Sequence, residues 1–340
     1  MRLLIVCQVV DSEHHNLGFF VRWIEEFAKN CEHVTVIANE VGAYTLPDNV
    51  TVLSLGKEKG ASRMLRYWRF IQFITTRVGE YDAVFSHMNP EFVIAGGWWW
   101  SLTNKKVIMW YVHGTVSLRL RLALAFVTAA CTVNKESLRI TSPKVHVVGH
   151  GIDTEFFKPG YRLKHDEALI VSAGRLSPSK HIDRIIDAAK IVHAEGTPLR
   201  LSIIGGPGLA TDQGYEEALH IRARDEQYIK FLGPQNQEFV RDAVASADIC
   251  VNASTTNSVD KAVLEAMAAG AVPITNNRAF KDMLEPLGLF VREESAQALA
   301  ACISDVLKRD LTPLRDRVRE IVVQNHALPS LITKILELYA

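Results

Sequence analysis

Cysteine pairs, a charge excess of either sign and membrane-length apolar runs are all missing from this chain of 340 residues. Lys plus Arg and Asp plus Glu number 38 each, and this zero net charge disfavours a nucleic-acid-binding protein. The apolar stretches 92–102 and 122–133 are shorter than the ~18–20 residues that cross a bilayer. No Cys-x-x-Cys pair occurs, which disfavours disulfides and zinc and predicts a reduced compartment; the cysteines are Cys7, Cys31, Cys131, Cys250 and Cys302.

Three motifs that mark common α/β enzymes are also missing. The sequence has no G-x-G-x-x-G, which disfavours a dehydrogenase, no G-x-x-x-x-G-K-[ST], which excludes P-loop chemistry, and no G-x-S-x-G nucleophile elbow. It also has no cluster of metal-ligand residues, so we expect no metal. Residues 1–6 run directly into a strand-like segment, so we expect no secretory leader and a cytoplasmic protein.

Apolar runs of strand length alternate with segments of helical period along nearly the whole chain. This order predicts parallel sheets with crossover helices, hence the α/β class, and about 150 residues per domain predicts two domains. A polar stretch at 157–166 separates the two series, so we expect two Rossmann-like halves with a ligand cleft at the carboxyl ends of their strands. Expected strands lie at 3–10, 34–38, 50–55, 83–86, 107–112, 168–173, 199–204, 229–232, 249–253, 272–275 and 289–291, and expected helices at 19–29, 181–193, 215–225, 236–247, 261–269, 295–308 and 328–340.

Two cations stand in the loop that opens the second series, in the run Gly174-Arg175-Leu176-Ser177-Pro178-Ser179-Lys180. The loop leads from a strand into a helix, where backbone N–H groups and the helix dipole favour an anion. Arg175 and Lys180 would suit a diphosphate there. The alternative is a pair of solvated surface charges.

Two later strand ends carry further candidates. Gly205 and Gly206 permit close approach of the backbone to a ligand, although the same residues would also suit a plain turn. Glu265 lies in a helix of otherwise apolar and small residues, where a buried carboxylate needs a hydroxyl or a cation. The alternative for Glu265 is an exposed helix position, which is common for glutamate.

These motifs occur in a characteristic order: Val148-Gly149-His150-Gly151-Ile152-Asp153, Gly174-Arg175-Leu176 with Lys180, Ile204-Gly205-Gly206-Pro207-Gly208, Phe231-Leu232-Gly233 and Leu264-Glu265-Ala266-Met267-Ala268-Ala269-Gly270. In this order the chain resembles glycosyltransferase family 4, over nearly its whole length and most strongly from 147 to 270. That family has the GT-B fold, in which two Rossmann-like domains face each other across a cleft and C-terminal helices cross back. Its members transfer a sugar from a nucleotide-sugar with retention at the anomeric carbon.

The resemblance implies roles for the residues that match the family's motifs. Arg175 and Lys180 would bind the donor diphosphate and, with His113, form the catalytic set; the alternative for His113 is a buried structural histidine. Glu265 would hold the ribose hydroxyls, and Leu232 would lie near the base. These cations and a helix N-terminus would replace a metal's charge. The full expected donor-binding set is Gly18, Gly205, Gly206, Leu232, Asn257, Ser258, Asp260, Lys261 and Glu265.

The sequence departs from the family's pattern in two loops. Asn257 stands where the first glutamate of the family's Glu-x7-Glu motif would fall, and Ser258-Val259-Asp260 replaces a glycine–aromatic–glycine stretch. The first loop keeps only Gly18 of the usual paired glycines. We expect Asp260 either to take over part of the missing contact to the donor sugar or to cap the helix that follows it.

The N-terminal half would bind the acceptor, a glycan or a lipid-linked glycan. Basic and aromatic residues are mixed at 62–70, and Arg119 and Arg121 follow the His113 loop. Such mixtures suit an anionic membrane surface, so a peripheral place on the inner, cytoplasmic face of the membrane stays open beside a solvated amphipathic helix. The run Trp98-Trp99-Trp100 would anchor at that interface or pack in the core.

One main function and two alternatives follow. The main expectation is a retaining hexosyltransferase that uses a nucleoside-diphosphate-sugar, a UDP or GDP sugar, as substrate and needs no cofactor. Its acceptor-side domain would span 1–158 together with 319–340, and its nucleotide domain 159–318. The alternatives are a GT-B nucleotide-sugar epimerase, or a catalytically silent nucleotide-sugar-binding protein, which Asn257 favours.

Overall fold

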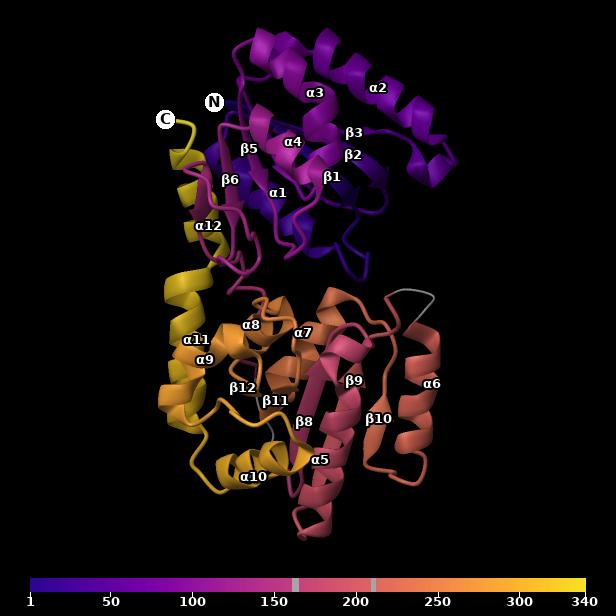
Figure 1. The fold of residues 1–340 in the computed structure, drawn as a ribbon, viewed down its shortest axis with the longest axis vertical. Coiled ribbons are helices and arrows are strands. Elements are labelled where there is room, and N and C mark those ends of the chain that lie inside the picture. Colours follow the sequence, from indigo (N-terminus) through magenta and orange to yellow (C-terminus); the bar gives the residue numbers. More distant parts are fainter. Residues whose placement is uncertain (161–164, 209–211) are drawn as a thin grey trace. The chain divides into compact units, whose positions relative to one another are not determined.

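The computed structural model describes residues 1–160, 165–208 and 212–340, and these divide into two units of α/β class. Unit 1 comprises Met1–Gly151 and Leu328–Ala340, and unit 2 comprises Ile152–Ala327 (Figure 1). The expected borders lay at 158/159 and 318/319. Residues 161–164 of the expected boundary segment lie outside the described part of the chain.

Unit 1 is built on a seven-stranded sheet in the order β3-β2-β1-β4-β5-β6-β7, with every neighbouring pair parallel. The central strand β1 is buried on both faces, which explains its nearly unbroken apolar sequence. The chain turns back between β1 and β4, so the carboxyl ends of these two strands form a topological switch point. The strands are β1 Arg2–Val10, β2 His33–Val41, β3 Val50–Ser54, β4 Ala83–His87, β5 Lys106–Trp110, β6 Ala129–Thr132 and β7 Val145–Val147.

Helices cover both faces of this sheet. Alternate strand residues such as Leu4 and Val84 pack with α2, α3 and α4 in one hydrophobic cluster. The opposite face meets α1, where the Phe27 ring packs at a tilt against Phe85 and the Trp23 ring meets Trp110 edge to face. The helical elements are α1 Phe19–Asn30, η1 Lys57–Lys59, α2 Arg63–Thr76, η2 Val78–Glu80, α3 Pro90–Leu102, α4 Leu118–Phe126 and α12 Leu328–Glu337.

The helix α2 begins at a side-chain cap and has a buried face and an exposed apolar face. Ser62 Oγ accepts a hydrogen bond from the Leu65 amide, which satisfies one free N–H of the first turn. Phe70 and Ile74 are fully buried, whereas the side chains of Met64 and Trp68 are exposed to 79% and 60%. The helix therefore packs through one face and presents an apolar pair to solvent.

The tryptophan run splits between the two environments expected for it. Trp100 is fully buried and donates to the Tyr81 hydroxyl over 3.2 Å. Trp99 is half-buried and donates to the Ile74 carbonyl, while Trp98 is exposed. Successive residues of a helix point about 100° apart, so three in a row cannot share one environment.

The last helix, α12, belongs to unit 1, and it confirms the helical pattern at 328–340 and the expected return of the chain (Figure 1). Its buried leucines and isoleucines pack on α1, and Gly151 leaves room for Leu331 and Trp23. Tyr339 donates its hydroxyl hydrogen to the Val84 carbonyl over 2.6 Å. The preceding helix α11, Thr312–His326, stays in unit 2.

Unit 2 repeats the architecture with a five-stranded parallel sheet in the order β10-β9-β8-β11-β12. Its switch point lies between the carboxyl ends of β8 and β11. The strands are β8 Ala168–Ala173, β9 Leu199–Ile204, β10 Ile229–Phe231, β11 Ile249–Asn252 and β12 Val272–Thr275. The other helical elements are η3 Pro178–Lys180, α5 Ile182–Ala194, α6 Gln213–Arg222, α7 Gln237–Ser246, α8 Lys261–Ala268, η5 Arg278–Phe280, α9 Lys281–Leu284, η6 Glu285–Leu287 and α10 Ala296–Leu307.

One expected strand is wrong. Residues 289–291 form a single bridge between Phe290 and Thr275 instead of a strand. Thr275 is the last residue of β12, so no further strand residue is left for the segment to pair with. The expected strands and helices elsewhere in unit 2 coincide with observed elements to within a few residues.

Candidate functional site

Glycines bring the loops after β8, β9 and β10 into direct backbone contact. The amide of Gly205 donates to the Gly233 carbonyl over 2.9 Å, and the amide of Leu176 donates to the Gly206 carbonyl over 2.9 Å. Gly205 has φ +137°, and a Cβ there would overlap the Gly174 carbonyl oxygen. Glycine is therefore required at Gly205 by the packing of these loops onto one another.

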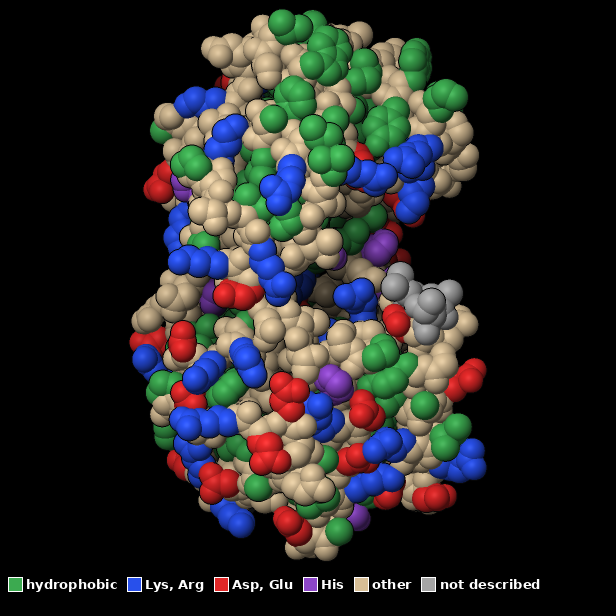
Figure 2. All heavy atoms as spheres, viewed as in Figure 1, with side chains coloured by type: hydrophobic (Ala, Val, Ile, Leu, Met, Phe, Trp, Pro, Cys, Tyr) green, Lys and Arg blue, Asp and Glu red, His purple; other side chains and the backbone are tan. Residues whose placement is uncertain are grey.

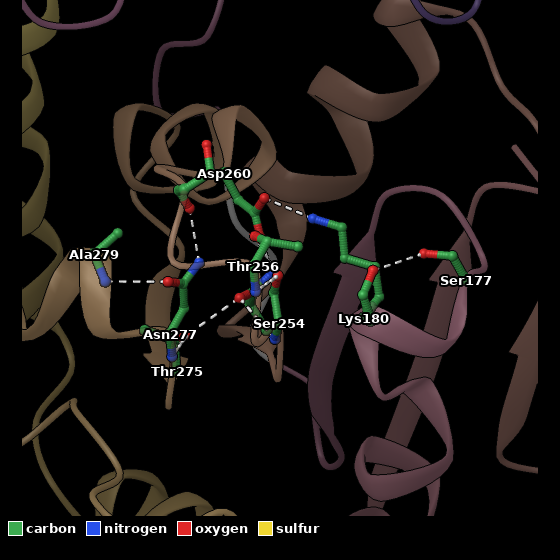
Figure 3. Close-up of polar contacts among 11 residues, drawn as sticks. Ser177, Lys180, Ser254, Thr256, Asp260, Thr275, Asn277 and Ala279 are labelled. Atoms are coloured by element: carbon green, nitrogen blue, oxygen red, sulfur yellow. Dashed lines mark hydrogen bonds and ion pairs between the residues drawn. The ribbon is translucent and has the colours of Figure 1, made fainter. Parts of the chain in front are cut away.

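Lys180 and Asp260 form an ion pair across the switch point of unit 2. Lys180 ends η3 in the loop after β8, and Asp260 directly precedes α8 in the loop after β11. The Lys180 Nζ lies 2.6 Å from Asp260 Oδ1 (Figure 3), and the two side chains are exposed to only 15% and 13%. The pairing joins residues 80 positions apart, one from each of the strands that flank the switch point.

The Asp260 carboxylate is held on its other side by residues of β11 and β12. Asn252 Nδ2 donates to Asp260 Oδ2 over 2.9 Å, and Asn252 Oδ1 accepts from the Thr275 hydroxyl over 3.1 Å. Asn252 and Thr275 are buried at the ends of their strands. Sequence reasoning did not single them out; the signal available was their position at strand ends before polar loops. Each carboxylate oxygen of Asp260 thus has a partner, and its side chain makes no cap bond to α8.

The same two loops are clamped by further contacts. The Thr255 amide donates to the Ser179 carbonyl over 3.1 Å, and the Thr255 hydroxyl lies 3.4 Å from His181 Nε2. Asn277 Nδ2 donates to the Ser258 carbonyl over 2.9 Å. The Thr255 contacts hold the loops after β8 and β11 against each other near the Lys180–Asp260 pair, and Asn277 ties the loop after β11 to the segment after β12.

Arg175 is exposed, and its side chain lies along the glycine loop after β9. A Cβ at Gly208 would come 2.7 Å from Arg175 Cδ, so the missing side chain makes room for the arginine. Among the residues that the structure describes, Arg175 has no ion-pair partner, whereas Lys180 has Asp260. Of the two expected cations, Arg175 therefore carries its charge without a fixed counter-charge from the described chain.

Asn257 adopts a left-handed backbone conformation, with φ +54°. Asparagine is one of the few residues besides glycine that tolerate this region, so its presence has a local conformational reason. Strained backbone of this kind concentrates at functional sites. Asn257 lies on the same loop as Ser258 and Asp260, a few residues beyond the switch point.

Glu265 is buried and paired within its own helix. Its carboxylate lies 3.0 Å from the Lys261 Nζ, one turn earlier in α8, and its side chain is exposed to only 5%. The expected cation partner of a buried carboxylate is thus Lys261, and the alternative of an exposed position is wrong. Leu232 is half-buried directly after β10, and its carbonyl accepts from Gln235.

The two expected site residues of unit 1 lie in the loops after β1 and β5. Gly18 precedes α1, and a Cβ there would come 2.6 Å from the Ser12 carbonyl oxygen, so the loop itself requires glycine. His113 is exposed, which excludes the buried structural alternative. It lines a pocket of about 570 Å³ together with Glu91, Tyr111 and Arg119. The His113 Nδ1 accepts from the Thr115 amide over 3.1 Å.

Two searches of the described residues concern metals and membranes. No group of three or more His, Cys, Asp or Glu side chains in the described part of the chain could hold a metal ion. None of the described helices has both the length and the apolar character needed to cross a bilayer.

Comparison with known proteins gives a family match for most of unit 2. Residues 167–309 match the family model described as glycosyl transferases group 1. This part of the chain is similar to a glycosyl transferase group 1 domain. The D-inositol 3-phosphate glycosyltransferase of Rhodococcus erythropolis is 30% identical to the chain over 140 residues, which are 37% of this chain and 31% of that protein. The chain thus matches about a third of the length of this curated relative.

Solved structures resemble the whole chain and not just the residues that match the family model. Anabaena HepE in complex with UDP and glucose gives a TM-score of 0.74 at 17% identity, covering 99% of this chain and 98% of that one. A sucrose-phosphate synthase from Thermosynechococcus elongatus gives 0.69 at 18% identity, covering 100% and 98%. The expected GT-B fold is therefore confirmed, and the residues that match the family model lie in its second Rossmann-like unit.

Proposed function

We propose that the protein is a glycosyltransferase that takes a hexose from a nucleoside-diphosphate-sugar, a UDP or GDP sugar, with retention at the anomeric carbon. The observation that carries the proposal is a pair of cations, Arg175 and Lys180, at the switch point of the unit that matches the glycosyl transferases group 1 model. Ligands of open parallel sheets bind at that point. The structure of HepE with UDP-glucose, a neighbour in fold, supports the donor class.

In this proposal the two cations stabilise the charge that develops on the departing diphosphate. Arg175 is free to reach the donor, and Lys180 would share its ammonium between Asp260 and the phosphates. The glycines Gly205 and Gly206 let the backbone approach the donor. Asn257, Ser258 and Lys261 would line the donor sugar and ribose, Glu265 would take the ribose hydroxyls, and Leu232 would contact the base.

The acceptor is proposed to enter unit 1, where His113 faces it in the loop after β5, while Gly18 in the loop after β1 would let the backbone approach the donor. The pocket of about 570 Å³ beside His113 has the size of a ligand site. Its Glu91 and Arg119 offer an acceptor and a donor of hydrogen bonds, which suits the hydroxyls of a glycan or a lipid-linked glycan.

A donor panel tests the function. The melting temperature of the wild type should rise when UDP, GDP or their hexose conjugates are added, because a bound ligand stabilises the folded state by mass action. This rise should be smaller in Arg175→Ala and Lys180→Ala. Losing one charge-assisted contact costs ~1.5–3 kcal/mol of binding. Arg200→Ala is the matched control, because Arg200 is an exposed unit 2 arginine paired with Glu167 at the amino end of β9, opposite the end that carries the site. Equal nucleotide affinity in all four proteins contradicts the site.

The same panel separates the alternatives through its products. Transfer or slow hydrolysis of the donor, with the anomeric configuration kept, supports a retaining transferase. Isomerised sugar would identify an epimerase, and binding without turnover would identify a silent nucleotide-sugar-binding protein. Either of these two results overturns the proposed reaction.

We further propose that unit 1 docks on the inner face of the cytoplasmic membrane. Large apolar side chains are exposed on α2, α3 and α4, and Figure 2 shows them gathered with Lys and Arg side chains at their edge. Apolar anchors rimmed by cations suit an anionic bilayer surface. The exposed apolar residues are Met64, Leu65, Trp68, Trp98, Leu102, Leu118 and Leu122.

Co-sedimentation with anionic vesicles at low and high salt tests the docking. Met64→Ser with Trp68→Ser should weaken it severalfold while leaving stability unchanged, because both side chains are exposed. Ile221→Ser is the matched control, since Ile221 is 63% exposed on unit 2. Wild-type protein that stays wholly in the supernatant contradicts the proposal.

A further inference from the structure

A second polar pocket of unit 1 lies near the carboxyl ends of β1 and β2, under α2. It measures about 150 Å³ and is lined by Gln8 and Asn39 from the sheet and by Arg63, Arg66 and Tyr67 from α2. Glu91 lines this pocket and also the larger pocket beside His113, so the two adjoin. None of these lining residues except Glu91 took part in the site described above.

Hydrogen bonds run through this pocket in one direction. Arg66 Nη1 donates to Asn39 Oδ1 over 2.6 Å, and Asn39 Nδ2 donates to Gln8 Oε1 over 3.1 Å. Gln8 Nε2 in turn donates to Asn89 Oδ1. The network therefore begins at a guanidinium and ends at the amide of Asn89, which is completely buried.

One lining residue of the pocket has a donor without a partner. The Arg66 Nε is buried and has no hydrogen-bond partner among the described residues. The same is true of the Nδ2 of Asn89, which is bonded to Gln8 but does not itself line the pocket. Arg63 lies over the Tyr67 ring, and no carboxylate of the described chain forms an ion pair with Arg63 or Arg66. Buried donors without partners cost free energy, and a ligand that brings acceptor oxygens would remove this cost.

The charges of the residues that line the pocket also favour a ligand with acceptor oxygens. Among the described residues that line the pocket, Glu91 is the one carboxylate, and it accepts from Arg119 over 3.0 Å and is balanced by it. The positive charges of Arg63 and Arg66 are thus not balanced by a carboxylate of the described chain. Two guanidinium groups around a space too small for a nucleotide fit a single phosphoryl group, which offers several acceptor oxygens to their forked donors.

We propose that this pocket binds a phosphoryl group of the acceptor, held by Arg63 and Arg66 against the amides of Gln8 and Asn39. That the ligand is the acceptor rests on the proposed function, because the larger pocket with His113 adjoins this one through Glu91. The phosphoryl group can belong to a soluble phosphate ester or to a lipid headgroup. Met64 and Trp68, exposed on the same helix, would reach a bilayer in the second case.

Inorganic phosphate is the first probe, titrated into protein that carries Lys180→Ala so that the donor site is weakened. Arg side-chain and Asn amide resonances report on the pocket directly. Saturable shifts of the Arg66 Nε and Asn39 Nδ2 signals are expected, with at least tenfold weaker binding in Arg66→Gln and in Arg63→Gln. Arg77→Gln is the matched control, since Arg77 lies at the far end of α2 and pairs with Glu80.

Two further probes distinguish the source of the phosphoryl group. Glycerol 3-phosphate represents a soluble ester, and vesicles of phosphatidylcholine with a minor share of phosphatidic acid represent a headgroup. If either probe binds more tightly than inorganic phosphate, and Arg66→Gln abolishes that binding, the result supports the site. The probe that binds more tightly then identifies the source of the phosphoryl group. Phosphate binding that is absent, or equal in Arg66→Gln and Arg77→Gln, overturns it. Binding without any sugar transfer would contradict the proposed function alone.

Discussion

At the residue scale, Asp260 is where the structure adds most to the sequence. Its carboxylate stands between Lys180 and Asn252, so it orients the ammonium that would meet the donor diphosphate. The hypothesis that Asp260 contacts the donor sugar stays a prediction. The pairing offers a second way in which the same carboxylate would influence turnover.

Asp260→Asn keeps the shape of the side chain and removes its charge. We expect kcat to fall at least tenfold, a barrier increase of ~1.4 kcal/mol, because Lys180 loses the partner that holds it in place. Stability should fall by ~1–3 kcal/mol, because the amide oxygen can accept from only one of the two donors, Lys180 Nζ and Asn252 Nδ2. Steady-state kinetics with melting curves measure both; unchanged kcat contradicts the role.

Asn257→Glu is the companion variant. It restores the carboxylate of the family's motif but places a glutamate in a left-handed conformation, so we expect a stability loss on the order of 1 kcal/mol. If the wild type binds nucleotide without transfer and Asn257→Glu alone transfers sugar, the natural protein is a silent relative.

Gly205→Ala tests the contact between the loops. Its Cβ would overlap the Gly174 carbonyl, so we expect the loops to separate, with a destabilisation of ~1–3 kcal/mol and weaker nucleotide binding. Gly214→Ala is the control, because nothing lies within 4 Å of its Cβ position and α6 should gain ~0.5–1 kcal/mol. Equal melting temperatures for the two variants would refute the expectation.

At the scale of elements, substitutions at two nearby residues of α2 should distinguish the role of the helix in packing from its role at the surface. Phe70→Ala removes a fully buried ring and should cost ~3–5 kcal/mol of stability. Trp68→Ala, two residues earlier and 60% exposed, should leave stability within ~0.5 kcal/mol and weaken vesicle binding. Denaturant melts measure stability, and co-sedimentation measures vesicle binding. If Phe70→Ala loses vesicle binding and Trp68→Ala keeps it, the result contradicts the docking face.

Sequence patterns predicted those elements whose residues repeat with a clear period. The stripe of Phe20, Trp23, Ile24 and Phe27 identified α1, whereas α3 and α4 are apolar on more than one side and showed no stripe. The strands β6 and β7 are only four and three residues long and gave no separate signal. Short or uniformly apolar segments carry too little periodicity to be assigned.

The same limit applies to the candidate site. Arg175 and Lys180 were identifiable because glycines and cations follow a strand in sequence. The pairing of Lys180 with Asp260, and the network from Arg66 to Asn89, join residues from different strands. Such contacts depend on strand order, which local patterns do not contain.

At the scale of the whole molecule, a truncation that ends at Ala327 should affect one unit only. It removes α12 and the Tyr339–Val84 bond from unit 1 and leaves every residue of unit 2 in place. We expect calorimetry to show a lowered or lost transition for unit 1 and an unchanged one for unit 2. Equal loss in both units would show that their stabilities are coupled.

The return of α12 to unit 1 also sets an order of events during synthesis. Unit 2 is continuous in sequence and emerges from the ribosome entirely before α12, the helix that completes unit 1. At about 5–20 residues per second, residues 152–340 take on the order of 10–40 s to appear, and domains fold as units once their residues are available. The first unit begun is therefore the last one finished, and the side of α1 that receives Leu331 stays uncovered in the nascent chain throughout that interval.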